Sequence, residues 1–290
     1  MNIFIVMKEL RIAMIEPLYS DLFKKHNYVM NVDYIVSSLI TEYDISKGNI
    51  SILRYMNLID EGLYWELYNA PKQERVVRVG LMMRENKELN KAVNDGFIEA
   101  KRLLFDANRI QDQEVQAIRN DAVYIINRKL DYTNFGPIQF MEKNVYNEYF
   151  KIAKKEYYYF FDPITQFERL DVKGINDAVL PLHEKYMLEF IKTIMWSVQN
   201  EPIEEAIGMI QAFDEKYKNF ELESGFYRRF DSESKFQTRR MSKYNTFKLD
   251  YLLNENEKIY LDISYNHQII EGLYRICSSI YFANNRRRYK

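Results

Sequence analysis

The spacing of apolar residues changes near residue 115, and this change constrains the fold of the 290-residue chain more than any other feature. Over residues 9–110 apolar residues recur every three or four positions, which predicts amphipathic helices. The clearest runs from Glu88 to Ile110, with its apolar side at Val93, Phe97, Ala100, Leu104 and Ala107. Over 115–173, short β-branched and aromatic runs between Asn, Gly, Pro and Asp predict an antiparallel meander.

Helical spacing returns after the predicted strands. It predicts a helix over 176–198, a second that opens at Pro202 and runs to about Tyr217, and a closing helix from Ile269 to Phe282. Residues 220–262 show no regular spacing. We therefore expect an α+β fold with a helical N-terminal part, a central antiparallel sheet and C-terminal helices on one sheet face. The expected division is 1–112, mainly helical, and 113–290, which holds the sheet, the last helices and a basic segment.

The composition indicates a folded chain in a reducing compartment. Hydrophobic residues make up 47% of the sequence and Gly and Pro are few, which excludes a disordered or collagen-like chain. The single Cys277 cannot form an internal disulfide, and with only three histidines it cannot complete a Cys/His zinc site. No apolar run reaches the ~18 residues of a membrane span, and the first residues do not resemble a signal peptide. We expect a cytoplasmic protein with no membrane partner and no bound metal; the sequence leaves the oligomeric state open.

The residue usage and the distribution of charge point to a phage protein with a basic C-terminal third. The chain has 24 Tyr and 18 Phe beside many Ile, Lys and Asn residues, which is typical of an AT-rich coding sequence such as that of a phage or a low-GC bacterium. If it is phage-encoded, the compartment is the host cytoplasm. The net charge of −1 excludes long-range attraction to nucleic acid. Residues 225–248, however, carry seven Lys and Arg against two acids, and the chain ends in NNRRRYK.

Residues 36–57, VSSLITEYDISKGNISILRYMN, resemble a helix-turn-helix DNA-binding segment. Leu39 and Tyr43 would belong to the first helix, Asp44 to the turn and Leu53 to the second helix. Such a unit presents short polar side chains to phosphates and base edges. The predicted contacts are Lys47, Asn49, Ser51 and Arg54. Simple packing of helices also explains this spacing, since three-helix bundles with the same spacing often bind no ligand.

A second resemblance is to the palm and thumb region of family B DNA polymerases, over about residues 118–175. It rests on IRNDAVYII (118–126), KKEY (154–157) and DVKGI (171–175), in the family's order. MIEPLYSDLFKKHN (14–27) is similar to the first palm motif of that family. The resemblance implies a catalytic Asp121 that shares Mg²⁺ with Glu16 or Asp21, and contacts to nucleic acid from Lys154, Lys155 and Lys173.

The hairpin has too few acidic residues for a complete polymerase site. Two-metal phosphoryl transfer needs carboxylates from two strands around paired Mg²⁺ ions. The hairpin offers only Asp121, because Arg119 and Asn120 occupy the positions where its partner would stand. We therefore expect no cofactor and no catalysis, and a degenerate or split palm subunit stays an alternative.

Residues 226–247, FYRRFDSESKFQTRRMSKYNTF, interleave aromatic and basic side chains. Arginines neutralise phosphates and aromatic rings stack on bases, so this pattern predicts binding of single-stranded nucleic acid. The predicted contacts are Arg228, Arg229, Arg239 and Arg240. The same residue types are enriched at protein interfaces, so a protein partner explains the pattern as well.

These observations favour a phage protein that binds DNA or RNA and acts in replication or its control. The alternative is a non-enzymatic phage protein that binds and inhibits a host protein complex. The sequence contains no phosphate-binding glycine loop and no serine nucleophile elbow, and HEKYM around His183 lacks the second histidine of a zinc protease motif.

Overall fold

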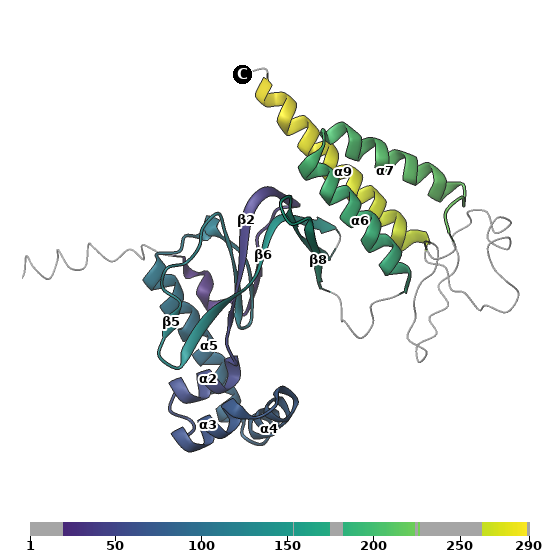
Figure 1. Ribbon diagram of the computed structural model, residues 1–290. Coiled ribbons are helices and arrows are strands. Elements are labelled where there is room, and N and C mark those ends of the chain that lie inside the picture. The colour runs from purple at the N-terminus through teal and green to yellow at the C-terminus, as the bar shows by residue number, and fades with distance from the viewer. Residues whose placement is uncertain (1–19, 153, 175–181, 224–225, 227–262, 289–290) are drawn as a thin grey trace, which may run out of the picture. The chain divides into compact units, whose positions relative to one another are not determined.

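The computed structural model describes residues 20–152, 154–174, 182–223, 226 and 263–288, which form two compact units (Figure 1). The first unit holds the described residues up to Asn31 together with Leu39–Val145. The second holds Val32–Ser38 and the described residues from Tyr146 onward. The predicted boundary at 112–113 falls inside the first unit.

The described strands form one antiparallel sheet in the order β1-β3-β4-β2-β6-β7-β8, with β5 paired to β6. They are β1 (Asn27–Val29), β2 (Tyr34–Ile45), β3 (Val115–Arg119), β4 (Ala122–Ile126), β5 (Asn134–Phe135), β6 (Ile138–Ile152), β7 (Lys155–Asp162) and β8 (Phe167–Lys173). The long strands β2 and β6 each contribute to both units. The α+β class, with helices before and after a central antiparallel sheet, is confirmed. The sheet departs from a simple meander because β2, early in the chain, pairs with β4 and lies between β4 and β6.

The helices of the first unit are grouped around one long helix. They are η1 (Asp21–Lys24), α2 (Gly48–Tyr55), α3 (Glu61–Asn69), α4 (Lys72–Glu85), α5 (Lys87–Asn108) and η2 (Asp112–Glu114). The predicted helix from Glu88 to Ile110 is confirmed as α5, which buries Val93, Phe97 and Leu104 against the sheet. The sheet contributes Tyr43, Val123 and other strand residues to this core. Because one side of α5 faces the core and the other faces solvent, its sequence shows a clear helical period.

The helix-turn-helix interpretation is wrong, because residues 34–45 form strand β2 and only 48–55 form a helix. The expectation that residues 9–110 are helical fails at the same segment and at β1. Ile40, Thr41, Glu42 and Tyr43 are buried in succession, so both sides of this central strand lie in the protein interior. A strand buried on both sides loses the alternation that distinguishes a strand from a helix.

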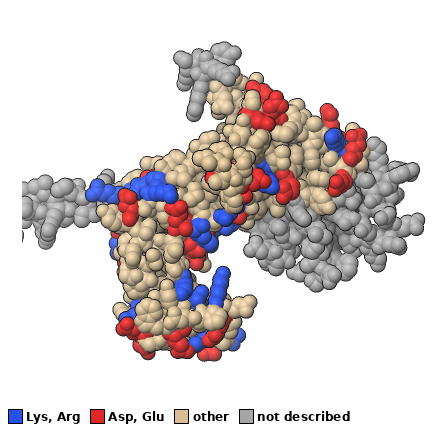
Figure 2. Space-filling model, in the orientation of Figure 1, with Lys and Arg blue, Asp and Glu red and all other residues tan. Residues whose placement is uncertain are grey.

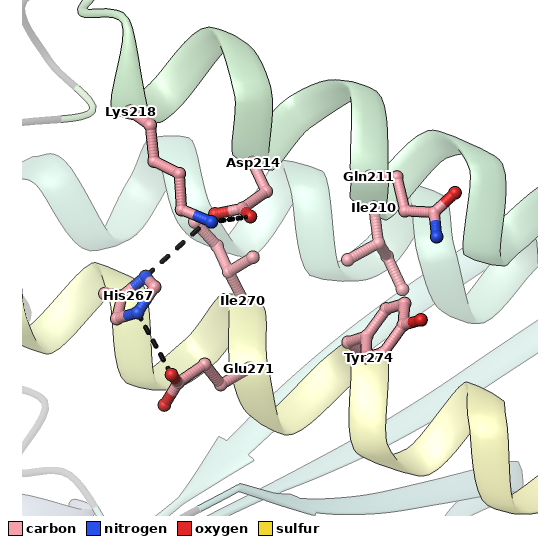
Figure 3. A pocket seen from close by; sticks show the side chains of 8 residues that line it. All are labelled: Ile210, Gln211, Asp214, Lys218, His267, Ile270, Glu271 and Tyr274. Carbon is pink, nitrogen blue, oxygen red and sulfur yellow. Dashed lines mark hydrogen bonds and ion pairs between the residues drawn. The ribbon is translucent and has the colours of Figure 1, made fainter.

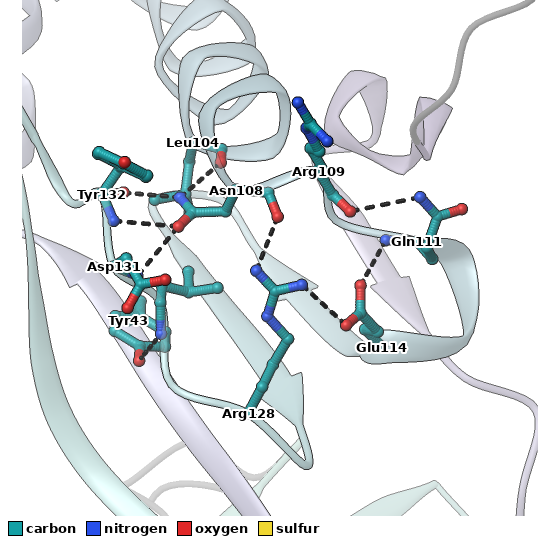
Figure 4. A network of polar contacts seen from close by, with 10 residues as sticks. Tyr43, Leu104, Asn108, Arg109, Gln111, Glu114, Arg128, Asp131 and Tyr132 are labelled. Atoms are coloured by element: carbon teal, nitrogen blue, oxygen red, sulfur yellow. Dashed lines mark hydrogen bonds and ion pairs between the residues drawn. The ribbon is translucent and has the colours of Figure 1, made fainter.

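A polar network fixes the end of α5 against the segment that follows β4 (Figure 4). The Asn108 amide donates to the carbonyls of Leu104 and Tyr132, and its side-chain oxygen accepts from the backbone N–H groups of Asp131 and Tyr132. Arg128 donates to the Asn108 carbonyl and forms an ion pair with Glu114 at 3.0 Å. The buried Asn108 side chain thus uses its hydrogen-bonding groups to stabilise this junction.

The second unit packs three helices on one face of its strands. They are α6 (Leu182–Asn200), α7 (Ile203–Lys218) and α9 (Ile263–Arg288), which lie side by side in Figure 1. Alternate residues of β6 and β7, such as Phe150, Ile152 and Tyr159, face the helices. The predicted helices from Pro202 and around Ile269–Phe282 are confirmed as α7 and α9. Among the described helices, none is long and apolar enough to cross a membrane.

Candidate functional site

A pocket of about 540 Å³ in the first unit contains residues from the two segments that resemble known families, 36–57 and 118–175. Its lining comes from the end of β2, the start of α2, one side of α4, the β3–β4 turn and β6. The charged and polar members are Asp44, Lys47, Asn49, Lys72, Arg75, Asp121 and Lys143. In Figure 2, basic side chains stand on both sides of the hollow between the end of the sheet and α4. Four of these seven side chains are cationic, so the pocket has an excess of positive charge.

Two of the four basic side chains, Lys143 and Lys47, are held by contacts with residues at least 21 positions away in the chain. Lys143 Nζ lies 2.8 Å from Asp44 Oδ2 and 3.7 Å from Glu42 Oε1, and the hydrogen bond from Lys143 to Asp44 raises the pKa of the lysine. Lys47 Nζ donates to the carbonyl of Tyr68 at 2.8 Å and lies over the Tyr68 ring. These contacts fix the positions of two positive charges at the pocket wall.

The other two belong to the first turns of α4. Arg75 Nη1 donates to the Ala70 carbonyl at 3.1 Å, and Lys72 is exposed at the first position of the helix. Both α2 and α4 begin without a side-chain hydrogen bond to their first N–H groups. The partial positive charge of each helix start therefore adds to the basic side chains around this pocket.

Asp121 lies in the β3–β4 turn, beside the start of α2 and next to Asp44. Its backbone carbonyl accepts from the N–H of Ile45, and a Cβ added at Gly48 would lie 3.5 Å from Asp121 Oδ2. Burial raises the pKa of Asp121, and the negative charges of Asp44 and Glu42 raise it further, against the opposite effect of Lys143. The pocket therefore contains two carboxyl groups: Asp44, which is paired with Lys143, and Asp121, whose charged form is disfavoured.

Of the two described carboxylates that the polymerase resemblance grouped, Asp121 lines the pocket and Asp21 does not. Asp21 lies on η1, where it forms an ion pair with Lys24, and it is not part of the pocket lining. Glu16 lies outside the described residues. Within the described part of the chain, no group of three or more His, Cys, Asp or Glu side chains is arranged to hold a metal ion.

The predicted nucleic-acid contacts fall at three places. Lys47 and Asn49 line the pocket. Ser51, which was expected to project outward, is buried and donates to the Ser46 carbonyl. Arg54 forms an ion pair with Glu61. In the second unit, Lys154 precedes β7, Lys155 begins it, and Lys173 is paired in register with Glu156, so these three lysines share one end of the β7–β8 ladder. Arg228, Arg229, Arg239 and Arg240 lie outside the described residues.

Sequence reasoning missed four charged members of the pocket: Asp44 as a site residue, Lys72, Arg75 and Lys143. Lys143 and Asp44 are 99 residues apart in the chain and meet only because β2 lies beside β6. Lys72 and Arg75 follow Pro71 in a charged sequence that looks like any exposed helix start.

A second pocket, of about 390 Å³, lies between α7 and α9 in the second unit (Figure 3). His267 of α9 points toward Asp214 and Lys218 of α7, and Glu271 of α9 points toward His267. His267 Nε2 lies 3.0 Å from Glu271 Oε1, and its Nδ1 lies 4.0 Å from Asp214 Oδ1, while Lys218 pairs with Asp214. Lys218 is thus held by Asp214, and the pocket contains none of the residues predicted from the sequence.

Comparison with known proteins identifies the chain by its family alone. A search of the curated proteins gives no match to this sequence. A protein-family model, described as the bacteriophage PBS1 gene 130 protein, matches residues 18–279 and thus covers both units. The chain is therefore a phage protein that belongs to the family of the bacteriophage PBS1 gene 130 protein.

Proposed function

We propose that this phage protein binds nucleic acid and acts in replication or its control, with a backbone phosphate held in the pocket beside Asp121. The observation that carries the proposal is the convergence of Lys47, Lys72, Arg75 and Lys143, from three separate elements, on one hollow. Phosphate contacts from lysine and arginine dominate the affinity of proteins for nucleic acid. The volume of the pocket lies within the range of sites that hold small ligands or single groups of larger ones.

The two carboxylates weaken this positive field only in part. Asp44 is neutralised by Lys143 at 2.8 Å, and burial raises the pKa of Asp121, which disfavours its charged form. Asn49 at the start of α2 adds a neutral donor at the pocket wall. The arrangement therefore favours an anion with several oxygen atoms, such as a phosphodiester.

The test is a salt titration of binding to labelled 20-nucleotide DNA and RNA, single- and double-stranded, by fluorescence anisotropy. Lys72 and Arg75 can be changed together to Gln without removing the lysines that hold Asp44 and Tyr68. We expect K72Q/R75Q to weaken binding about tenfold or more and to reduce the slope of log K against log salt by about 2, because each lost phosphate contact removes nearly one unit. The matched control, K87Q/K91Q, removes two exposed charges at the start of α5 that do not line the pocket. Equal effects of the two pairs, or no binding by the unchanged protein at low salt, would reject the proposal.

Asp121→Asn separates phosphate binding from the polymerase alternative. Loss of a negative charge beside the phosphate is expected to tighten binding about two- to fivefold, since the interaction is partly screened. A palm-type enzyme would instead show nucleotide incorporation with Mg²⁺ that disappears in D121N. Incorporation by the unchanged protein that is lost in D121N would contradict our expectation of a non-catalytic protein.

A further inference from the structure

The outward side of α4 is apolar at its centre although it faces solvent. Val77 and Leu81 are 59% and 41% exposed, and Gly80 lies next to Leu81. Residues three and four apart share one side of a helix, so Val77, Gly80, Leu81 and Arg84 form a continuous stripe with Glu74 beside it. Val79, only 1% exposed, points to the opposite side. We call Glu74, Val77, Gly80, Leu81 and Arg84 the α4 outer face.

Gly80 has no packing role among its own neighbours. A Cβ added there meets nothing within 4 Å, so an alanine would fit. Glycine in the interior of a helix costs about 1 kcal/mol relative to alanine. A glycine on an exposed helix side is useful when the backbone of another element approaches closely.

The charges of the α4 outer face are arranged symmetrically about its apolar centre. Val77 and Leu81 lie two residues before and after Val79, and Glu74 and Arg84 lie five residues before and after it. If two copies of this helix pair antiparallel at the level of Val79, each Val77 meets the opposite Leu81. The same register places each Glu74 beside the opposite Arg84. Apolar contact and charge complementarity therefore require one and the same register.

We propose that the α4 outer face binds a second copy of this chain, with the two α4 helices antiparallel about a two-fold axis. An isologous pairing of this kind closes on itself and leaves no free copy of the face. One helix face buries much less than a standard interface, so the dimer is weak, with a dissociation constant of about 10–100 µM.

This interface is independent of the proposed nucleic-acid site. Lys72 and Arg75 line the pocket, whereas Val77 and Leu81 do not, so changes in the outer face leave the pocket lining intact. Failure of one proposal therefore leaves the other standing, and the two are measured by different experiments.

Sedimentation equilibrium of the full chain from 1 to 200 µM tests the proposal. We expect a reversible monomer–dimer equilibrium, which Val77→Asp weakens at least tenfold because it places a charge in the apolar centre. The control is Ile164→Asp, since Ile164 is 91% exposed in the β7–β8 turn and lies outside α4. A monomer at all concentrations, or equal loss in both variants, overturns the proposal.

A charge exchange distinguishes this specific pairing from nonspecific association through an apolar surface. Glu74→Arg alone places two arginines together at each contact, and Arg84→Glu alone places two glutamates together. Each single variant is expected to weaken the dimer about three- to tenfold, and the double variant E74R/R84E to restore it. Thermal melts of the monomers control for the cost of reversing charges at the helix ends. A double variant as weak as the sum of the single variants overturns the antiparallel register.

Discussion

Two fully buried ionisable side chains, Glu148 in the second unit and Lys101 in the first, each give the protein a distinct dependence on pH. Glu148 of β6 is fully buried in the second unit, and neither of its carboxylate oxygens has a hydrogen-bond partner there. Burial raises the pKa of Glu148 well above its usual value. The same carboxylate contributes, after burial itself, to the raised pKa of the Cys277 thiol, about 12, so this cysteine is unreactive at neutral pH.

Glu148→Gln is expected to remove a pH-dependent loss of stability. A carboxyl whose pKa is higher in the folded than in the unfolded state favours folding below the unfolded pKa, and this contribution is lost as the pH rises toward the folded value. Urea unfolding from pH 4 to pH 8 should show the Gln variant gaining on the unchanged protein by up to ~1.4 kcal/mol per pH unit. Glu142→Gln, at an exposed position on the same strand, controls for the loss of one charge. Parallel stability curves for the unchanged protein and E148Q would show that Glu148 is solvated or paired.

Lys101 predicts that the stability of the first unit rises, rather than falls, with pH in the alkaline range. This lysine of α5 is fully buried, its Nζ donates to the Lys25 carbonyl, and burial lowers its pKa to about 8 despite the nearby Asp121. Between the folded and unfolded pKa values only the unfolded chain holds the proton, so stability should rise with pH from about 8 to about 10.5, by up to ~3 kcal/mol. We expect this rise to be absent in Lys101→Met and present in Lys91→Met, an exposed lysine of the same helix. A rise of the same size in both variants would assign it to other groups.

At the scale of single elements, the sequence predicts those that have one buried side and fails for those that have two. α5 shows its period because only one side of the helix enters the core. β2 carries apolar residues at helical spacing but is a central strand in which residues 40–43 are all buried, so that both of its faces lie in the interior there. The spacing of apolar residues shows how many sides of an element are buried. Only the pairing of β2 with β4, roughly 80 residues later in the chain, decides between helix and strand.

The contact between α2 and α5 predicts a glycine that cannot be replaced. A Cβ added at Gly96 of α5 would clash with Ile52 Cγ2 of α2 and would lie 3.1 Å from Cγ of Met56, the residue that follows α2. We expect Gly96→Ala to destabilise the first unit by about 1–3 kcal/mol, because overpacking at this contact exceeds the gain in helix propensity. Gly208→Ala in α7, where an added Cβ meets nothing within 4 Å, should stabilise by up to ~1 kcal/mol. Urea unfolding measures both, and a neutral G96A would mean that α2 shifts to accommodate the methyl group.

At the scale of the whole molecule, sequence reasoning identified the fold class and part of the candidate site. Lys47 and Asn49 were found through a helix-turn-helix interpretation that is wrong, and they line the pocket because the turn after β2 places them there. Asp121 is singled out by the polymerase resemblance, and it lines the pocket because the turn between β3 and β4 places it there. Lys143 could not be found, since its position beside Asp44 depends on the order of the strands. A site assembled from distant elements requires the topology, which local patterns do not contain.

The remaining prediction concerns the distribution of basic charge along the chain. Four basic side chains of the first unit line the pocket, and residues 225–248, outside the described residues, carry seven Lys and Arg against two acids. If both contact phosphates, they act as separate sites whose free energies add. Changing Arg228, Arg229, Arg239 and Arg240 together to Gln should then reduce the slope of log K against log salt by up to ~4, and adding K72Q/R75Q by about 2 more. Anisotropy titrations at several salt concentrations measure all three variants. If the four-arginine variant binds as tightly as the unchanged protein with the same salt slope, the segment has another role, and the protein-interface explanation of its aromatic and basic residues becomes the better one.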